Sequence, residues 1–180
     1  ADDVHRLLSY ATAQVARLAR AQAARGSHYT LIGESTAGPD VCSPAMYRRY
    51  AFPYEQRLIA DLRATGVEAG IHMCGNATRI VPDMVRTGAL YFELDSKIDR
   101  TAVRQATNDR VTIFGTVDPG HLLPHGTAAQ VADAARHDIW LLGRQGRYVL
   151  SPGCTLPFDT PLENVSALVT VAREDGRYDA

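Results

Sequence analysis

The sequence predicts an α/β protein made of parallel βα units, about five of them after a leading helix. Short runs rich in β-branched and aromatic residues alternate with longer segments of helical periodicity. Hydrophobic residues make up 46% and charged residues 22%, as in globular domains with one core. No linker, low-complexity stretch or block of charge divides the chain, so residues 1–180 are expected to form a single domain.

The first predicted helix has apolar residues at i, i+3 and i+4 spacing from Val4 to Leu18, and Gly26 is its stop. Residues 29–33 are rich in β-formers and predict the first strand. Ser43 and Pro44 are suited to cap and open the next helix, which runs toward residue 66. Pro53 lies inside that helix, where it is expected to kink or break it.

The remaining units follow the same rules. Strands are expected at residues 67–73, 89–94, 111–114 and 148–150. Helices are expected at residues 78–86, 99–106 and 127–143, with a last helix from Pro161 onward. A long loop with two prolines is expected at residues 115–126. Such an order of strands and helices gives a parallel sheet with right-handed crossovers.

Charge and cysteine content exclude several classes of protein. Lys and Arg total 19 against 20 Asp and Glu, so no basic field favours nucleic acid or an anionic membrane. No apolar run approaches the roughly 20 residues of a membrane span. The terminus Ala1-Asp2-Asp3 has neither an initiator Met nor the features of a signal peptide. Three widely spaced cysteines predict a reducing, cytoplasmic setting.

Polar and metal-ligating side chains follow the predicted strands. In order they are Glu34 and Ser35; His72, Cys74 and Asn76; Glu93 and Asp95; Asp118 and His121; Cys154 and Asp159. The pattern leaves two architectures open, an open doubly wound sheet or part of a (β/α)₈ barrel. Both bind ligands at the carboxyl ends of their strands, so these residues are the candidates for a site.

His72, Cys74 and Cys154 are the strongest of these candidates. His72 and Cys74 stand at i and i+2, so both side chains point to one face of a strand. Imidazole nitrogen and two thiolates are ligands that favour Zn²⁺ over Mg²⁺ or Ca²⁺. Taken singly, a strand His is more often structural and a free Cys is more often a buried apolar residue. Together they predict a metal site.

Other conspicuous residues are interpreted as structural. Cys42 precedes a helix start, and His121 and His125 lie in the long loop, where a surface position is the simplest interpretation. The segment from Tyr47 to Tyr50 spreads over several helix faces, which favours a solvated face with one core Tyr over a nucleic-acid contact. No G-x-G-x-x-G or phosphate loop is present, which argues against a dinucleotide or nucleotide enzyme.

Several motifs resemble the uroporphyrinogen decarboxylase superfamily. They are Ile71-His-Met-Cys-Gly-Asn76, Gly115-Thr-Val-Asp-Pro119, Ser151-Pro-Gly-Cys-Thr-Leu-Pro157 and Asp159-Thr-Pro-Leu-Glu-Asn164, together with Ser43-Pro44, Tyr50 and Pro53-Tyr54. The resemblance runs from Ile32 to Ala172. The His-x-Cys-Gly and Pro-Gly-Cys motifs look most like the corrinoid-dependent branch, the methylcobalamin:coenzyme M methyltransferases. Decarboxylases of the superfamily need no metal and lack the His-x-Cys motif, which argues against decarboxylation.

The resemblance implies a (β/α)₈ barrel with Zn²⁺ held by His72, Cys74 and Cys154. In the similar zinc site of cobalamin-independent methionine synthase a Glu completes the ligands, and Glu93 stands at the matching place, 21 residues after His72. Asp95 is expected on the same strand face, so Glu93 or Asp95 is the expected fourth ligand.

The resemblance also suggests residues around the metal. Glu34, Asn76, Asp118 and His121 are expected near the substrate or behind the ligands. Asp118 is expected to orient His72 through its second ring nitrogen.

The implied function is a zinc-dependent methyltransferase. It would move a methyl group from a corrinoid, methylcobalamin or a corrinoid protein, to a zinc-activated thiol such as coenzyme M. Two alternatives stay open: a uroporphyrinogen decarboxylase-like enzyme acting on a tetrapyrrole, and a non-catalytic metal-binding barrel fragment. The expected partners are a corrinoid protein and a small thiol, with no nucleic acid and no membrane.

The length bears on the completeness of the barrel. A (β/α)₈ barrel takes about 250 residues and seldom fewer than about 200, whereas this sequence has 180. The chain is therefore expected to be the C-terminal portion of a barrel that lacks its N-terminal units. Its open sheet edges call for a homo-oligomer or a missing N-terminal segment to complete the barrel.

Overall fold

The computed structural model describes residues 2–144 and 146–177, so Ala1 of the N-terminal motif lies outside the described residues. One five-stranded sheet runs through this part of the chain, with the strands in sequence order and every neighbouring pair parallel. The strands are β1 (Thr30–Gly33), β2 (Ala69–Met73), β3 (Tyr91–Leu94), β4 (Thr112–Val117) and β5 (Tyr148–Pro152). The predicted parallel sheet is confirmed.

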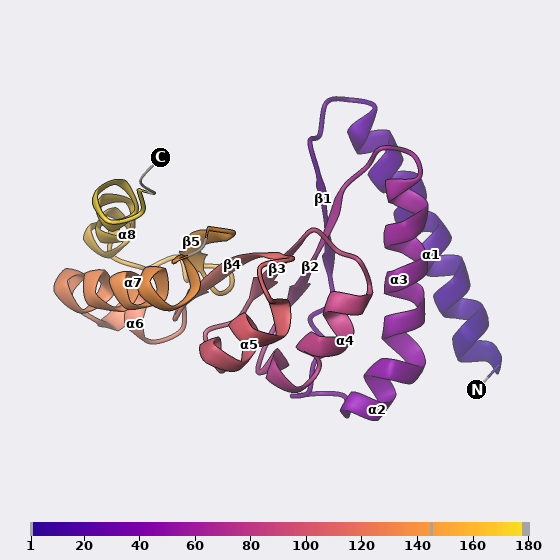
Figure 1. The fold of residues 1–180 in the computed structure, drawn as a ribbon, viewed down its shortest axis with the longest axis horizontal. Coiled ribbons are helices and arrows are strands. Elements are labelled where there is room, and N and C mark those ends of the chain that lie inside the picture. The colour runs from indigo at the N-terminus through magenta and orange to yellow at the C-terminus, as the bar shows by residue number, and fades with distance from the viewer. Residues whose placement is uncertain (1, 145, 178–180) are drawn as a thin grey trace.

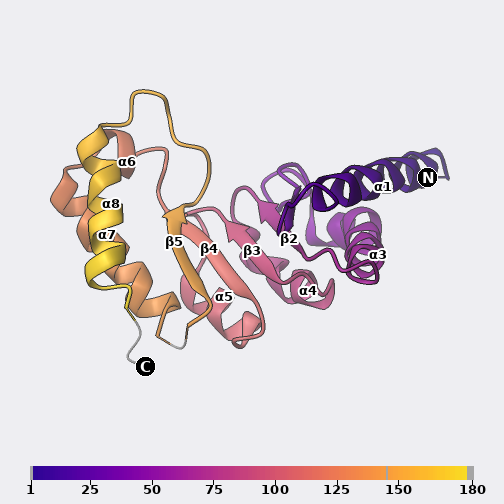
Figure 2. The same ribbon diagram turned by 90° about the horizontal axis from the view of Figure 1, so that it is seen from above.

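Helices follow the strands and also precede the first one. The longer ones are α1 (Asp2–Ala23), α3 (Phe52–Arg63), α5 (Arg100–Thr107), α7 (Ala128–Leu142) and α8 (Leu162–Glu174). The short ones are α2 (Pro44–Met46), the π-helical turn η1 (Tyr47–Ala51), the 3₁₀ turn η2 (Ala77–Arg79), α4 (Val81–Arg86) and α6 (Leu122–His125). They form an open half ring around the sheet, with α1 and α3 at one end, α4 and α5 behind it, and α6 to α8 at the other end (Figure 1, Figure 2).

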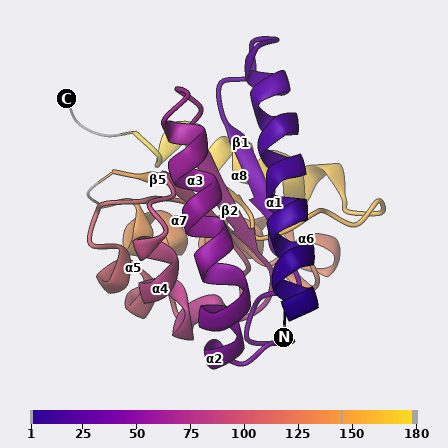
Figure 3. The same ribbon diagram turned by 90° about the vertical axis from the view of Figure 1, so that its right-hand side faces the viewer.

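The helix around Pro53 differs from the sequence prediction in an instructive way. Ser43 caps its start by accepting a hydrogen bond from Met46 N, and the helical path then continues to Arg63. Pro53 lies in the first turn of α3, directly after the π turn η1. Proline has no N–H to donate, and a wider turn before it satisfies the neighbouring backbone groups. Pro53 therefore changes the local helix type but does not end the helical segment. α3 packs beside α1 (Figure 3).

Element boundaries shift by a few residues, most clearly around β4. This strand extends to Val117, three residues past its predicted end, and α6 lies inside the predicted loop. The following helix starts as expected, because Thr127 and Gln130 form a complete capping box. Among the described residues, no helix is long and apolar enough to cross a membrane.

The main core lies between the sheet and the half ring of helices. Ile71, Phe92 and Ile113, from three adjacent strands, are all 0% exposed and belong to one apolar cluster. A smaller cluster joins β4 to α6, α7 and α8. Buried Asp138 of α7 accepts hydrogen bonds from Arg100 Nε at 2.5 Å and Thr116 Oγ1 at 2.7 Å. This charged contact fixes α7 and α5 to β4.

The opposite, concave face of the sheet carries the polar residues. Tyr91 contacts Tyr29 and Phe114 at ring distances of 5.3 and 5.1 Å, which gives this face an aromatic layer. His72 and Glu93 are register partners on β2 and β3, and Phe114 follows in the same row on β4. The carboxyl ends of the strands therefore bring polar side chains together above an aromatic floor.

Candidate metal centre

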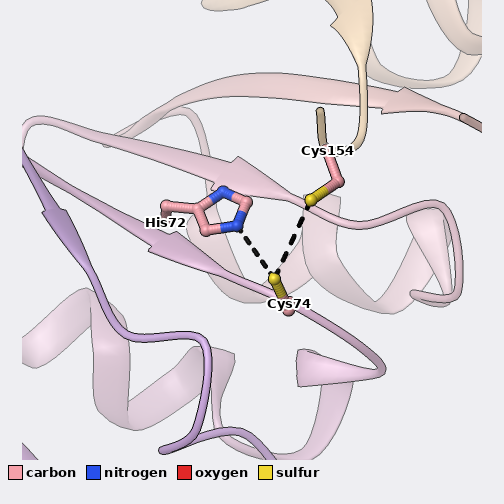
Figure 4. Close-up of side chains that lie close together, drawn as sticks. All are labelled: His72, Cys74 and Cys154. Atoms are coloured by element: carbon pink, nitrogen blue, oxygen red, sulfur yellow. Dashed lines mark hydrogen bonds between the residues drawn. The ribbon is translucent and has the colours of Figure 1, made fainter. Parts of the chain in front are cut away.

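Three metal-ligating side chains meet at the carboxyl edge of the sheet. His72 is on β2, Cys74 follows its end, and Cys154 follows β5 (Figure 4). His72 Nε2 lies 3.0 Å from Cys74 Sγ, which lies 3.9 Å from Cys154 Sγ. The three ligand atoms all lie within 4.8 Å of one another. Donors around a tetrahedral Zn²⁺ are about 3.5–3.8 Å apart, given Zn–S of about 2.3 Å and Zn–N of about 2.0 Å. The cluster has the size of a zinc site.

Cys154 reaches this cluster from a distant strand. β3 and β4 separate β2 from β5, and three strand spacings in a flat sheet amount to about 14 Å. The curvature of the sheet shortens that distance, and the loop after β5 turns back over the ends of β4 and β3. Gly153 N donates to Val117 O at 2.8 Å, so the start of this loop is held against β4.

Two glycines make this close crossing possible. A Cβ on Gly153 would lie 2.7 Å from Ser96 N, a contact that no side chain tolerates. Gly115 has a φ of 112°, and a Cβ there would lie 2.4 Å from Leu94 O. Both positions therefore require glycine, which explains physically why Gly precedes the cysteine in the Pro-Gly-Cys motif.

Glu93 lies behind the imidazole and not among the three ligand atoms. Its Oε2 is 2.9 Å from His72 Nδ1, on the side of the ring away from Cys74. The two atoms are close but not aligned as a hydrogen bond, and Nδ1 has no other hydrogen-bond partner. A carboxylate on Nδ1 leaves Nε2 free for a metal, which is the usual arrangement of a metal-ligating histidine. The carboxylate beside His72 Nδ1 is that of Glu93 and not the expected Asp118.

Asp95 has a structural task. β3 ends at Leu94, so Asp95 stands one residue past its strand, as Cys74 stands one residue past β2. Its carboxylate accepts hydrogen bonds from Gly75 N at 2.9 Å and from Lys97 N at 3.2 Å. These bonds fix the turn that follows Cys74. Of the two expected fourth ligands, neither is in the three-residue cluster, and Glu93 is the one that contacts it.

The electrostatics of the cysteine pair favour a bound cation. Burial raises the pKa of the Cys74 thiol, and the neighbouring Cys154 raises it further, while the Ser35 hydroxyl opposes both effects with a hydrogen bond. Two thiolates this close repel each other unless a cation lies between them. A metal deprotonates coordinating thiols outright. A donor set of one imidazole and two thiols, with a histidine already backed by a carboxylate, fits Zn²⁺.

The centre opens into a cavity of about 490 Å³ on the concave face. Its lining consists of Leu31, Gly33, Ser35, His72, Cys74, Glu93, Ser151, Pro152, Cys154 and Thr155. A small substrate therefore has direct access to the ligand atoms from this side.

Five other predicted residues have different surroundings. Asn76 caps η2 by accepting a hydrogen bond from Thr78 N, and Asp118 accepts from the backbone N–H groups of Gly120 and His121. His121 is exposed, as is Asp159. Glu34 lines a separate cavity behind β1. The structure does not bring these side chains into the cluster, because each belongs to a local turn, the surface or another layer.

Sequence reasoning missed the burial of several polar side chains, and Glu55 is the most consequential. One core Tyr was expected in the segment from Tyr47 to Tyr50; it is Tyr47, and its hydroxyl donates to Glu55 Oε2 at 2.5 Å. Glu55 is only 2% exposed. A carboxyl in a helical repeat gives no sequence signal of burial, since Glu is common on solvated helix faces.

The chain has five parallel βα units, and side chains suited to bind a metal lie at the carboxyl ends of its strands. These features define a segment of a (β/α)₈-barrel enzyme. The model of the uroporphyrinogen decarboxylase family, "Uroporphyrinogen decarboxylase (URO-D)", matches residues 1–175. The chain belongs to this family, as the sequence motifs predicted.

Similar proteins include methyltransferases and uroporphyrinogen decarboxylases. A methylated-thiol–coenzyme M methyltransferase of Methanosarcina mazei is 28% identical over 180 residues, which are 99% of this chain and 47% of that protein. A methylcobamide:CoM methyltransferase of Methanosarcina acetivorans is 30% identical over 156 residues, 86% of this chain and 44% of the relative. A uroporphyrinogen decarboxylase of Thermus thermophilus is 30% identical over 171 residues, which are 94% of this chain and 48% of that protein.

Solved structures agree on the fold. A methyltransferase from Methanosarcina mazei superposes with a TM-score of 0.83 at 26% identity, over 93% of this chain and 48% of its own. A dihydropteroate synthase of Xanthomonas albilineans, at 22% identity and a TM-score of 0.61, shares the fold alone. The chain spans about half the length of the curated relatives it matches.

Proposed function

We propose that this chain carries the metal centre of a zinc-dependent methyltransferase that moves a methyl group from a corrinoid to a thiol such as coenzyme M. The observation that carries the proposal is the cluster of His72, Cys74 and Cys154 at the carboxyl edge of the sheet. The relatives named as methylcobamide:CoM methyltransferases support it.

In this proposal His72 Nε2 and the two cysteine sulfurs hold Zn²⁺. The bound ion supplies a Lewis acid that keeps a coordinated thiol deprotonated near neutral pH. Glu93 orients the imidazole, Ser35 donates to Cys74, and Asp95 fixes the turn behind it. Because Glu93 Oε2 lies against Nδ1, Glu93 would have to turn away from the imidazole to become the fourth ligand.

The transfer itself is a displacement at carbon. The thiolate sulfur of the acceptor takes the methyl group, the carbon–cobalt bond breaks, and the corrinoid keeps the electron pair. The open cavity on the concave face admits the acceptor, and the methyl donor approaches from the same side. A corrinoid protein is the proposed partner, and the free state of the cysteines fits the proposed cytoplasmic location.

Completion of the barrel is part of the proposal. β1 and β5 are the edges of the sheet, and an unpaired strand edge attracts further strands. We propose that the chain is a single domain equivalent to the last five units of the barrel, and that other βα units, from an N-terminal segment or a second copy, cover these edges in the active protein.

A methyl-transfer assay tests the activity. The chain is incubated with methylcobalamin and coenzyme M, and the loss of the methylcobalamin absorbance is followed. Turnover is expected to depend on zinc and to fall at least 100-fold in Cys74→Ala, whereas Cys42→Ala, which lies outside the cluster, keeps it. Zinc binding without turnover would instead support the fragment alternative, a metal-binding module that needs the rest of the barrel.

The decarboxylase alternative is supported by the relatives of that name. It predicts tetrapyrrole decarboxylation that is independent of zinc and of both clustered cysteines. Decarboxylation that survives in Cys74→Ala and in the presence of a chelator would replace the methyltransferase proposal.

A further inference from the structure

A second cavity, of about 560 Å³, lies behind β1 and is separate from the metal centre. α1 forms one wall, and the helical segment from α2 to α3 forms the other. The lining is mostly apolar and aromatic, with Val4 and Leu8 from α1, Ile32 from β1, and Tyr47, Tyr54 and Leu58 from the facing helical segment. Its volume is in the range of about 300–1,000 Å³ that small-molecule sites occupy.

Two carboxyl groups face this apolar space. Glu55 is 2% exposed, and no described residue is a hydrogen-bond partner of its Oε1, although Oε2 accepts from the Tyr47 hydroxyl. Glu34 is half-buried, and no described Lys or Arg side chain pairs with it or with Glu55. A buried carboxyl oxygen without a partner is unfavourable, so a donor that reaches Oε1 stabilises the complex.

The electrostatics select the sign of the ligand. No basic residue lines the cavity, so a carboxylate or phosphate ligand finds no partner there. Burial raises the pKa of Glu34, and burial together with the nearby Glu34 raises the pKa of Glu55 to about 8. An ammonium or amidinium group supplies both the missing N–H donors and the missing charge.

The cavity has built walls and is not a gap between loose helices. His5 of α1 stacks on Tyr50 at 5.3 Å, and its Nδ1 lies 2.9 Å from the Tyr54 hydroxyl. Arg20 of α1 also pairs with Asp61 of α3 at 2.6 Å. These contacts hold α1 against α3 on both sides of the apolar lining.

We propose that this cavity binds a small organic cation, with an aromatic or aliphatic body in the apolar lining and an amino or amidino head on Glu55 and Glu34. The proposal is independent of the methyl-transfer function, because neither residue is in the metal cluster. Glu34 is adjacent in sequence to Ser35, so the two sites lie on opposite sides of one strand end.

Three probes with the same body and different heads test the charge requirement: 4-phenylbutylamine, 4-phenylbutanol and 4-phenylbutyrate. Their binding is measured by isothermal titration at a pH above the Glu55 pKa of about 8, and the contact site is mapped by amide chemical shifts. The amine is expected to bind at least 10-fold more tightly than the alcohol, with the acid weakest. The shifts are expected to cluster around Glu55 and Leu58.

Variants complete the test. Glu55→Gln keeps the shape and is expected to weaken amine binding at least 10-fold. Ala11→Phe fills the cavity and is expected to abolish binding, whereas Ala13→Phe, on another face of α1, leaves it unchanged. All three are expected to keep their zinc content. Equal binding of amine and alcohol, unchanged binding in Glu55→Gln, or shifts away from this cavity would overturn the proposal.

Discussion

His72 stands between a carboxylate and a thiol: Nδ1 lies 2.9 Å from Glu93 Oε2, and Nε2 lies 3.0 Å from Cys74 Sγ. The side chains are only 12% and 31% exposed, so water screens the contact between His72 and Glu93 weakly. The pair is in register on adjacent parallel strands, which fixes it without help from any loop. Glu93 is therefore placed to act on the proposed metal centre through the ring.

Replacing Glu93 by Gln tests this positioning role. Loss of the carboxylate is expected to weaken zinc affinity about 10–100-fold, as for other partners of ligating histidines. Competition with a chromogenic chelator measures the affinity, and Glu163→Gln, at an exposed position of α8, is the control. Thermal unfolding of the metal-free protein is expected to stay unchanged. Equal zinc affinity in Glu93→Gln and the wild type would show that Glu93 has no role in the site.

The Pro-Gly-Cys loop offers a steric test. In Gly153→Ala the new methyl group would lie 2.7 Å from Ser96 N, which is backbone and has no freedom to move away. The loop is expected to lift and carry Cys154 out of the cluster, with a loss of about 1–3 kcal/mol in unfolding free energy. Gly120→Ala, whose methyl group meets only Asp118 Oδ1 at 3.5 Å, is the matched control. Zinc affinity and urea unfolding are measured for both, and equal behaviour would contradict the crossing role of Gly153.

Much of this site follows from local sequence rules. His72 and Cys74 share a strand face because side chains alternate, and strand ends meet at one edge in any parallel sheet. The resemblance to the family motifs added Cys154 to the predicted ligands. The helix caps at Ser43, Asp99 and Thr127 could also be predicted from the sequence. In each, the side chain accepts a hydrogen bond from the backbone N–H only three residues later.

The parts that escaped prediction depend on tertiary packing. Glu93 lies near the end of β3 and Asp118 directly follows β4, so both were candidates to contact His72. Only the register between β2 and β3 decides that Glu93 is the one that lies beside it. Asp95 was expected as a possible metal ligand beside Glu93, but its carboxylate accepts hydrogen bonds from Gly75 N and Lys97 N. The burial of Glu55 depends on how α1 closes over α3, a contact between segments about 50 residues apart that no local pattern encodes.

Glu55 is expected to make stability depend on pH. The folded protein raises the pKa of Glu55 from 4.5 to about 8, so it holds this proton more tightly than the unfolded chain does. The contribution of Glu55 to the free energy of unfolding is fully present below pH 4.5. As the pH rises from 4.5 to about 8 this contribution is lost, and above pH 8 it no longer changes. At neutral pH the loss is roughly 3 kcal/mol, at 1.4 kcal/mol per pKa unit.

Glu55→Gln removes this titration. The variant is expected to be more stable than the wild type at neutral pH and to have a flatter profile between pH 4.5 and 8. Urea unfolding across this range measures the difference between the two proteins, which cancels the other titrating groups. Parallel profiles for the two proteins would show that Glu55 is already ionised in the fold.

Zinc content is the most direct test of the metal centre. The chain is purified under reducing conditions, and its metal is measured by mass spectrometry together with Cys74→Ala, Cys154→Ala and Cys42→Ala. About one zinc ion per chain is expected in the wild type and in Cys42→Ala, and less than about a tenth of that in the other two. A wild-type chain that is folded but binds no added zinc, or a Cys74→Ala/Cys154→Ala double variant that keeps its zinc, would contradict the assignment.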